Sequence, residues 1–166
     1  AFDADETIAR AKDAGVTKLV VVGTTAEDSQ KTVAFAAARE NVWASIGLHP
    51  HDAKFGEDAF SVLKSLAGSP KIVAVGECGL DYYYNHSSKD DQARALEFQL
   101  QLAKDHNLPV IFHVRDAFDD FWPIFDRFGP ISGVIHSFTA TTTELEQALA
   151  RGLYIGLNGI MTFTKD

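Results

Sequence analysis

Cysteine is almost absent from this chain, which has a single one, Cys78, among 166 residues. One cysteine excludes a disulfide framework within the chain and is typical of proteins from a reducing compartment. No apolar run approaches the roughly 20 residues that a membrane-spanning helix needs. The first residues include Asp3, Asp5 and Glu6, unlike the basic start of a secretory signal peptide. We therefore expect a cytoplasmic protein.

Basic residues are scarce as well. The chain has 15 lysines and arginines against 23 aspartates and glutamates, which gives a net charge of −8. This balance excludes the broad basic surface with which proteins coat duplex DNA. It does not exclude a nucleic-acid substrate, because bound divalent metals can reverse the local field.

Helix and strand patterns alternate along the chain. Short apolar or β-branched runs predict six strands, at residues 18–23, 42–47, 72–75, 110–112, 133–135 and 153–157. Helical patterns lie around residues 3–14, 26–39, 57–66, 92–107, 117–128 and 141–150. No linker or low-complexity segment divides them, and 46% of the residues are hydrophobic. We expect one domain over residues 1–166, built from repeated βα units around a parallel sheet.

Such βα units are compatible with two architectures, a doubly wound open sheet and a (β/α)8 barrel. A dinucleotide-binding open sheet would carry a Gly-x-Gly-x-x-Gly turn after its first strand. The first predicted strand ends in Val22-Gly-Thr-Thr25, so that fingerprint is absent.

Side chains that bind metals follow several of the predicted strands. His49, Glu77, His113 and His136 each come one or a few residues after an apolar run. Their separations of 28, 36 and 23 residues are each about one βα unit. A single histidine after a strand is usually a core or loop residue, but in a barrel the ends of successive strands converge. Imidazole and carboxylate together suit zinc, manganese or magnesium, so we expect a divalent metal site.

Longer motifs surround these residues. They are Gly47-Leu-His-Pro-His51, Gly76-Glu-Cys-Gly-Leu-Asp-Tyr-Tyr83, Gln99-Leu-Gln-Leu-Ala103, Leu108-Pro-Val-Ile-Phe-His-Val-Arg-Asp-Ala117, His136-Ser-Phe138, and Gly156-Leu-Asn-Gly159 with Thr162-Phe163. In this order, and over essentially the whole chain, the motifs resemble the TatD family of metal-dependent deoxyribonucleases in the metallo-dependent hydrolase superfamily. The resemblance implies a (β/α)8 TIM-type barrel that cleaves nucleic-acid phosphodiesters with two divalent metals, often as a 3′-to-5′ exonuclease on single strands.

The resemblance also implies a set of metal ligands. It makes Glu77 the catalytic carboxylate that bridges both metals, and His113 and His136 ligands of one of them. The family's other metal uses a His-x-His pair at the end of the first strand and an aspartate after the last strand. Neither is present in this chain. We therefore expect about six βα units of the barrel, lacking its first and last strands, as an internal fragment.

Residues beside these ligands have further predicted roles, each with an alternative. The resemblance makes His49 and His51 active-site residues; His49 would contact a substrate phosphate, while His51 could support the ligands or cap a helix. Asp81 could orient the histidines through their second ring nitrogen, or form a turn. Arg115 could bind a phosphate through two hydrogen bonds, pair with a neighbouring aspartate or lie in solvent.

Three consecutive tyrosines, Tyr82, Tyr83 and Tyr84, could stack on a splayed base, because an aromatic ring accepts any base. They cannot all face one way, so at least one should pack against the protein. Cys78 should point away from the side chain of Glu77, as a small buried apolar residue and not a nucleophile.

These observations predict a two-metal nuclease for single-stranded DNA or RNA, using magnesium, manganese or zinc. We expect a monomer with no obligate protein partner and no membrane contact. One alternative is an amidase, lactonase or phosphotriesterase-like hydrolase on the same barrel. Many relatives of that kind carry a carbamylated lysine where Glu77 stands, and no lysine is found there. The other alternative is an inactive chain that retains one metal or phosphate site.

Overall fold

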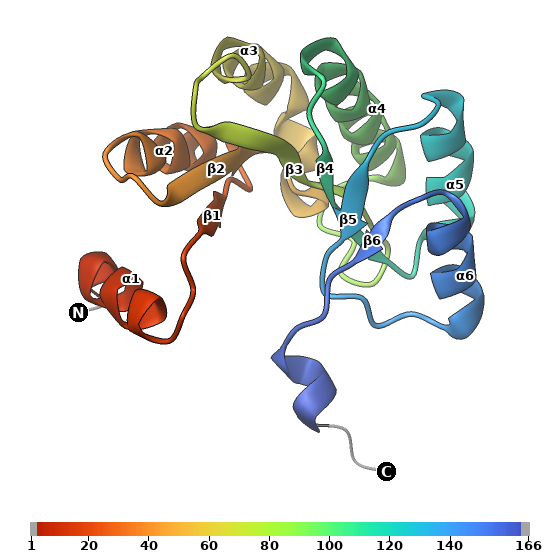
Figure 1. The fold of residues 1–166 in the computed structure, drawn as a ribbon. Coiled ribbons are helices and arrows are strands. Elements are labelled where there is room, and N and C mark those ends of the chain that lie inside the picture. Colours follow the sequence, from red (N-terminus) through yellow and green to blue (C-terminus); the bar gives the residue numbers. More distant parts are fainter. Residues whose placement is uncertain (1–2, 164–166) are drawn as a thin grey trace.

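A computed structural model describes the chain over residues 3–163, in which strands and helices alternate (Figure 1). The strands are β1 (Leu19–Val22), β2 (Val42–Ile46), β3 (Ile72–Asp81), β4 (Val110–Arg115), β5 (Gly133–Ile135) and β6 (Tyr154–Ile155). The helices are α1 (Ala4–Asp13), α2 (Ala26–Ala37), α3 (Gly56–Leu66), α4 (Lys89–His106), α5 (Phe118–Arg127) and α6 (Thr142–Ala150), with the short 3₁₀ helices η1 (Pro50–Phe55) and η2 (Gly159–Phe163).

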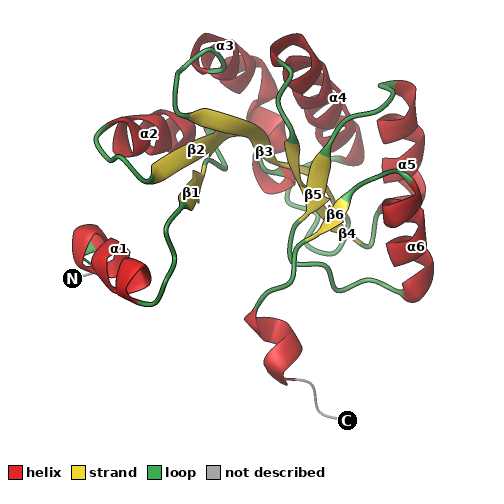
Figure 2. Cartoon of the chain, in the orientation of Figure 1, coloured by secondary structure: helices red, strands yellow, loops and turns green. Residues whose placement is uncertain are grey.

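The six strands form one parallel sheet, in which each strand pairs with the next one along the chain. Helices α2 to α6 lie along the outer face of the curved sheet (Figure 2). A doubly wound sheet would instead reverse its strand order and carry helices on both faces. The sequential order and the one-sided helices therefore confirm the predicted barrel architecture, of which this sheet forms six strands.

The core fills the space between the sheet and its outer helices. Leu96, Leu100 and Ala103 lie on one face of α4 at helical spacing, and each is at most 1% exposed. On the neighbouring unit, the ring of Phe112 on β4 packs edge-on against Phe121 of α5, with centroids 5.2 Å apart. The apolar residues of these units thus face the interior between the sheet and the helices. No helix within residues 3–163 is both long and apolar enough to cross a membrane.

Strand β3 is longer than the sequence predicts. The pattern places its end at Val75 because a glycine follows, but the strand continues to Asp81. Its pairing with β4 shifts between Val75 and Cys78, where β3 has one residue more than its partner. Such a β-bulge redirects the side chains that follow it. Cys78 is fully buried, as predicted.

Two glycines let β3 keep its pairing with β4 through this irregular stretch. Gly76 has a φ of 133° and Gly79 a φ of 151°, conformations that side-chain-bearing residues rarely adopt. A Cβ at Gly76 would lie 2.4 Å from the carbonyl oxygen of Ile111, and one at Gly79 would lie 1.9 Å from that of His113. The close approach of these two strands therefore depends on the missing side chains.

Candidate metal centre

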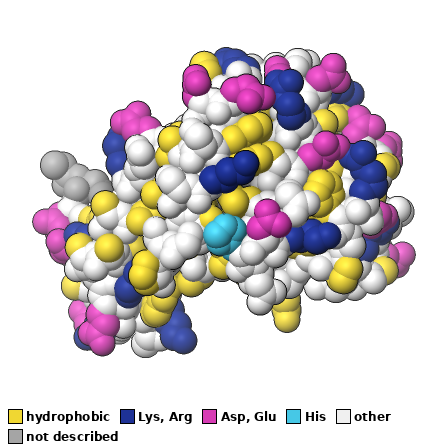
Figure 3. Space-filling view, turned by 90° about the horizontal axis from the view of Figure 1, so that it is seen from above, with side chains coloured by type: hydrophobic (Ala, Val, Ile, Leu, Met, Phe, Trp, Pro, Cys, Tyr) yellow, Lys and Arg dark blue, Asp and Glu magenta, His cyan; other side chains and the backbone are white. Residues whose placement is uncertain are grey.

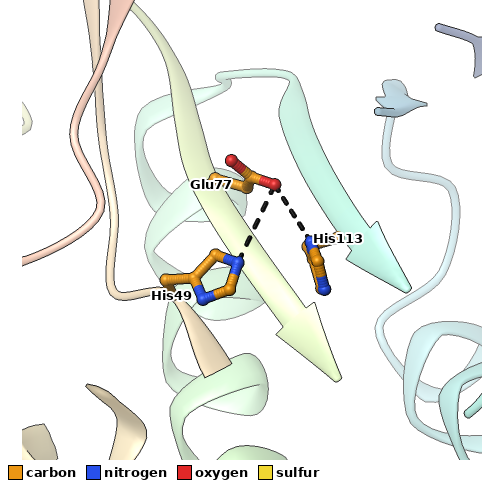
Figure 4. Close-up of side chains that lie close together, drawn as sticks. All are labelled: His49, Glu77 and His113. Atoms are coloured by element: carbon orange, nitrogen blue, oxygen red, sulfur yellow. Dashed lines mark hydrogen bonds and ion pairs between the residues drawn. The ribbon is translucent and has the colours of Figure 1, made fainter. Parts of the chain in front are cut away.

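Three neighbouring strands bring His49, Glu77 and His113 together. His49 follows β2, Glu77 lies in β3 and His113 lies in β4, and their side chains converge (Figure 4). One nitrogen or oxygen from each lies within 4.8 Å of the others. Glu77 Oε1 is the shared atom, 3.1 Å from His113 Nδ1 and 3.9 Å from His49 Nε2. Within the described part of the chain, this is the one group of histidine, cysteine and acidic side chains with metal-binding spacing.

The end of β1 fixes two members of this group through the backbone. The N–H of Glu77 donates to the carbonyl of Gly23 at 3.1 Å, and the N–H of His49 donates to that of Thr24 at 2.8 Å. Gly23 and Thr24 directly follow β1. These hydrogen bonds hold His49 and Glu77 side by side although β2 and β3 carry them separately.

Asp81, at the end of β3, is fully buried next to the group. Its Oδ2 is the acceptor for two imidazoles, 3.0 Å from His51 Nε2 and 2.8 Å from His113 Nε2. Its Oδ1 accepts the backbone N–H groups of Tyr83 at 3.0 Å and Tyr84 at 2.9 Å. One carboxylate thus closes the turn after β3 and contacts two histidines.

Burial and charge set the protonation of the three side chains. Burial, followed by the charge of His113, lowers the pKa of His49 to about 4. Burial also opposes a charge on His113, but its hydrogen bonds to Glu77 and Asp81 outweigh burial and raise the pKa of His113. Burial acts to raise the pKa of Glu77, yet the His113 hydrogen bond and nearby histidine charges lower it. An anionic carboxylate therefore faces one neutral and one readily protonated imidazole.

His136 lies outside this group. It follows β5, its side chain is exposed, and its Nε2 is 3.0 Å from Ser137 Oγ. Its charge still contributes to the lowered pKa of Glu77. His136 thus lies near the Glu77 carboxylate, as the strand-end pattern predicts. It does not belong to the group in which His49, Glu77 and His113 have metal-binding spacing.

Arg115, at the end of β4, stacks on two tyrosines. Its guanidinium carbon lies 4.0 Å from the ring centroid of Tyr83 and 5.0 Å from that of Tyr84. Tyr83 and Tyr84 are 59% and 51% exposed. The Arg115 side chain makes no hydrogen bond or ion pair with any residue in the described range, so it is not paired with a neighbouring aspartate. Its fork of N–H donors is free for a ligand.

Tyr82 is the tyrosine of the three that packs against the protein. It is partly buried, and its hydroxyl donates to Asp120 at 2.9 Å. Lys89 lies over its ring, 3.8 Å from the centroid. Tyr82, Tyr83, Lys89 and Arg115 line a cavity of about 630 Å³. Acidic, basic and histidine side chains also lie close together on the face seen from above (Figure 3).

Two glutamines on α4, to which the sequence patterns assign no role, hold the backbone around the site. The amide of Gln99 accepts from the N–H of Leu48 at 2.7 Å and donates to its carbonyl at 3.1 Å. Gln92 bonds Asp81 in the same way, at 2.8 and 3.1 Å. Both glutamines are fully buried. The sequence does contain a signal for this role. The two glutamines are seven residues apart, on the same helical face as Leu96, and a polar side chain on a buried face needs a hydrogen-bond partner inside the protein.

The donor set fits a divalent cation. Carboxylate oxygen suits magnesium and manganese, and imidazole nitrogen suits zinc. Metal-binding histidines usually donate their other ring N–H to a carboxylate, and His113 has that contact with Asp81. No second group of three such side chains with this spacing is found among residues 3–163.

The sequence matches a known protein family and several of its members. Residues 1–166 match the family described as TatD related DNase. The 3′-5′ ssDNA/RNA exonuclease TatD of Cronobacter sakazakii is 43% identical over 160 residues, which cover 95% of this chain and 61% of that protein. The protein of the same name from Escherichia coli K12 is 39% identical over 162 residues, covering 96% and 62%. The chain thus spans about three fifths of the length of these relatives.

Solved structures agree with the fold. The crystal structure of YjjV, a TatD homologue from Escherichia coli K12, superposes with a TM-score of 0.88 at 32% identity, over 96% of this chain and 64% of that one. A TatD-family hydrolase from Entamoeba histolytica gives 0.80 at 24% identity, over 93% and 56%, and shows the fold alone. Sequence match, strand order and the matching structures lead to one conclusion: this chain belongs to the TatD-related DNase family.

Proposed function

We propose that this chain carries the catalytic centre of a metal-dependent hydrolase that cleaves phosphodiester bonds of single-stranded DNA or RNA from the 3′ end. The observation that carries the proposal is the shared oxygen of Glu77, which faces the imidazoles of His49 and His113 beside a buried aspartate. Relatives that are about 40% identical bear the name of 3′-5′ ssDNA/RNA exonuclease.

Glu77 and His113 would hold a divalent cation, and we propose His136, from the next strand end, as a further ligand. When bound, the cation would supply positive charge to the phosphate oxygens and lower the pKa of a water molecule. Because His113 Nε2 contacts Asp81, its Nδ1 is the nitrogen that faces Glu77. The family resemblance implies a second cation, with Glu77 shared between the two.

The substrate would lie over Arg115 and the exposed tyrosines. A planar guanidinium without a carboxylate partner matches the oxygens of a phosphate through two parallel hydrogen bonds. Tyr83 and Tyr84 flank it and are largely exposed, so the bases of a flexible strand could stack on the parts of these rings that Arg115 leaves uncovered. A duplex could not offer its base faces in this way, which favours a single strand. His51 would act indirectly, since it shares Asp81 with His113.

Glu77→Gln tests the proposal, because it keeps the shape of the side chain and removes its charge. In the full-length protein with added Mg²⁺ or Mn²⁺, hydrolysis of 5′-labelled single-stranded DNA should fall by more than the 10- to 100-fold that loss of an outer-shell metal partner typically costs. Glu146→Gln, an exposed site on α6, is the matched control and should behave as wild type. Equal activity in the two variants would overturn the proposal. Faster turnover of lactones or amides than of DNA would favour the related hydrolases instead.

A further inference from the structure

The cavity of about 630 Å³ that Arg115 lines is formed by the loops that follow three neighbouring strands. Tyr82 and Tyr83 follow β3, residues 116–120 follow β4, and residues 139–141 follow β5. Enzymes with barrel architecture bind their substrates between the loops at the carboxyl ends of the strands. The volume is within the range of roughly 300–1,000 Å³ that is usual for small-molecule pockets, so the cavity has room for one nucleoside.

Strand β4 connects this cavity to the candidate metal centre. His113 and Arg115 are two residues apart in β4, so their side chains leave the same face of the sheet. Two residues of a strand span about 6.6 Å, which is close to the length of one nucleotide in an extended single strand. A phosphate that reacts beside Glu77 and His113 therefore places the adjoining nucleoside at the cavity.

The cavity carries more negative than positive charge. Its charged lining residues are Lys89 and Arg115, and Asp116, Asp119, Asp120 and Glu144. A second phosphate inside the cavity would face this negative excess, and like charges placed against each other oppose binding. The acids do not have the spacing to share a cation, because the one group with such spacing in the described range is that of Glu77. The lining thus favours a part of the substrate without charge.

Two of these acids are available to a ligand. Asp120 accepts the hydroxyl of Tyr82 at 2.9 Å, and Glu144 belongs to the N-terminal cap of α6. The carboxylates of Asp116 and Asp119 make no hydrogen bond and no ion pair with any residue among 3–163. An ionised carboxylate only accepts hydrogen bonds, so this pair can receive a hydroxyl group but not a phosphate oxygen.

We propose that this cavity holds the 3′-terminal nucleoside of the substrate and selects strands whose 3′-hydroxyl is free. Asp116 and Asp119 accept the hydrogen bond of that hydroxyl, and they repel a strand that ends in a phosphate or continues past this point. Tyr83, which is 59% exposed and lines the cavity, offers its ring to the terminal base. The inference rests on the proposed phosphodiester hydrolysis. It makes the two acids specificity residues that restrict cleavage to the end of a strand.

Two substrates that differ only at the 3′ end test this role. In the full-length protein with Mn²⁺, kcat/KM for 5′-labelled single-stranded DNA with a 3′-hydroxyl should be at least about tenfold higher than for the same strand with a 3′-phosphate. In Asp116→Asn/Asp119→Asn the two values should differ by less than about threefold, because the KM for the phosphate end falls. Asparagine tolerates the left-handed backbone of Asp116, whose φ is 52°, so this variant should fold.

Asp105→Asn/Glu146→Gln is the matched control. It removes the same two charges from exposed positions on α4 and α6 that do not line the cavity, and it should keep the wild-type ratio. Equal degradation of both ends by the wild type, an unchanged ratio in the cavity variant, or the same fall in the control would overturn the inference.

A wild-type protein that degrades neither strand would overturn the proposed function instead. Fluorescence anisotropy in EDTA, where no strand is cleaved, then still compares the affinities of the wild type for the two ends. Tighter binding of the 3′-hydroxyl end, lost in the cavity variant alone, would support the selection of a free end. Equal affinities would overturn it.

Discussion

The middle of the sheet and its two edges are built differently. In β2 and β3 most residues are buried, and α4 contributes two fully buried glutamines beneath them. At one edge, β1 leaves Val20 48% and Val22 38% exposed, and the nearby α1 buries no residue. At the other edge, β6 has two residues, and Tyr154 is 74% exposed.

The difference shows which strands hold the side chains of the candidate metal group in fixed positions. All three members of the candidate metal group come from β2 to β4 or the residues directly after them. There, polar groups are paired with backbone that dense packing holds still. His136 comes from β5, closer to an edge, and its side chain is exposed. His136 is thus the predicted ligand that lies outside the group.

The largest loss of stability is expected from a substitution that disrupts the middle of the sheet. Gln99→Leu would leave both backbone groups of Leu48 buried and unpaired, at about 1–3 kcal/mol for each group. We expect the free energy of unfolding to fall by about 3 kcal/mol in urea denaturation. Gln101→Leu, on the exposed side of the same helix, is the matched control and should change it by less than about 0.5 kcal/mol. Similar losses in both variants would show that the buried amide has no special role.

Amide hydrogen exchange in the wild-type protein should show the same difference between the middle and the edges of the sheet. The N–H of Val75 in β3 donates to the carbonyl of Pro109 inside the sheet, whereas that of Leu19 in β1 donates to Asn41 at its edge. We expect edge amides to exchange on the order of 100-fold faster than those of β3, because the edge can open alone. Equal rates measured by NMR would mean that the sheet opens as one unit.

The smallest change in stability is expected for an ion pair between the helices near β6. Arg151 donates to both carboxylate oxygens of Asp126 at 2.7 Å, and these bonds hold the pKa of Asp126 below its usual 3.8. A lowered carboxyl pKa stabilises the fold above that range, and this contribution is lost as the pH falls through the folded-state pKa. Because the pair is exposed, Asp126→Asn should cost under about 1 kcal/mol at pH 6. The difference between variant and wild type should shrink as the pH is lowered below 3.8, and a loss that stays constant would contradict this origin.

The sequence predicts much of the middle of the sheet. Apolar runs of strand length and helices with a 3.6-residue period predict the order of elements, and the strand-end pattern singles out Glu77 and His113. These two meet because parallel strands present their carboxyl ends at one edge. The predicted end of β3 at Val75 is wrong because a glycine usually stops a strand, and no pattern shows that Gly76 continues it through a bulge.

The hydrogen bonds of the site could not be predicted in the same way. The hydrogen bond from the His51 N–H to His49 Nδ1 depends on the start of η1, a short helix that no sequence pattern predicts. The bonds of Gln99 cross 51 residues of chain to Leu48. Such contacts depend on how elements pack in space, and periodicity along the chain does not carry that information.

Gly79 has a consequence for anyone who maps tolerance to substitution in this protein. Even alanine there would collide with the backbone of His113, so β4 would have to move and take the imidazole with it. A saturation screen for activity should therefore reject every replacement at this position as firmly as at Glu77. Such a map would mark Gly79 as part of the reaction centre, although its contribution is the space that it leaves empty.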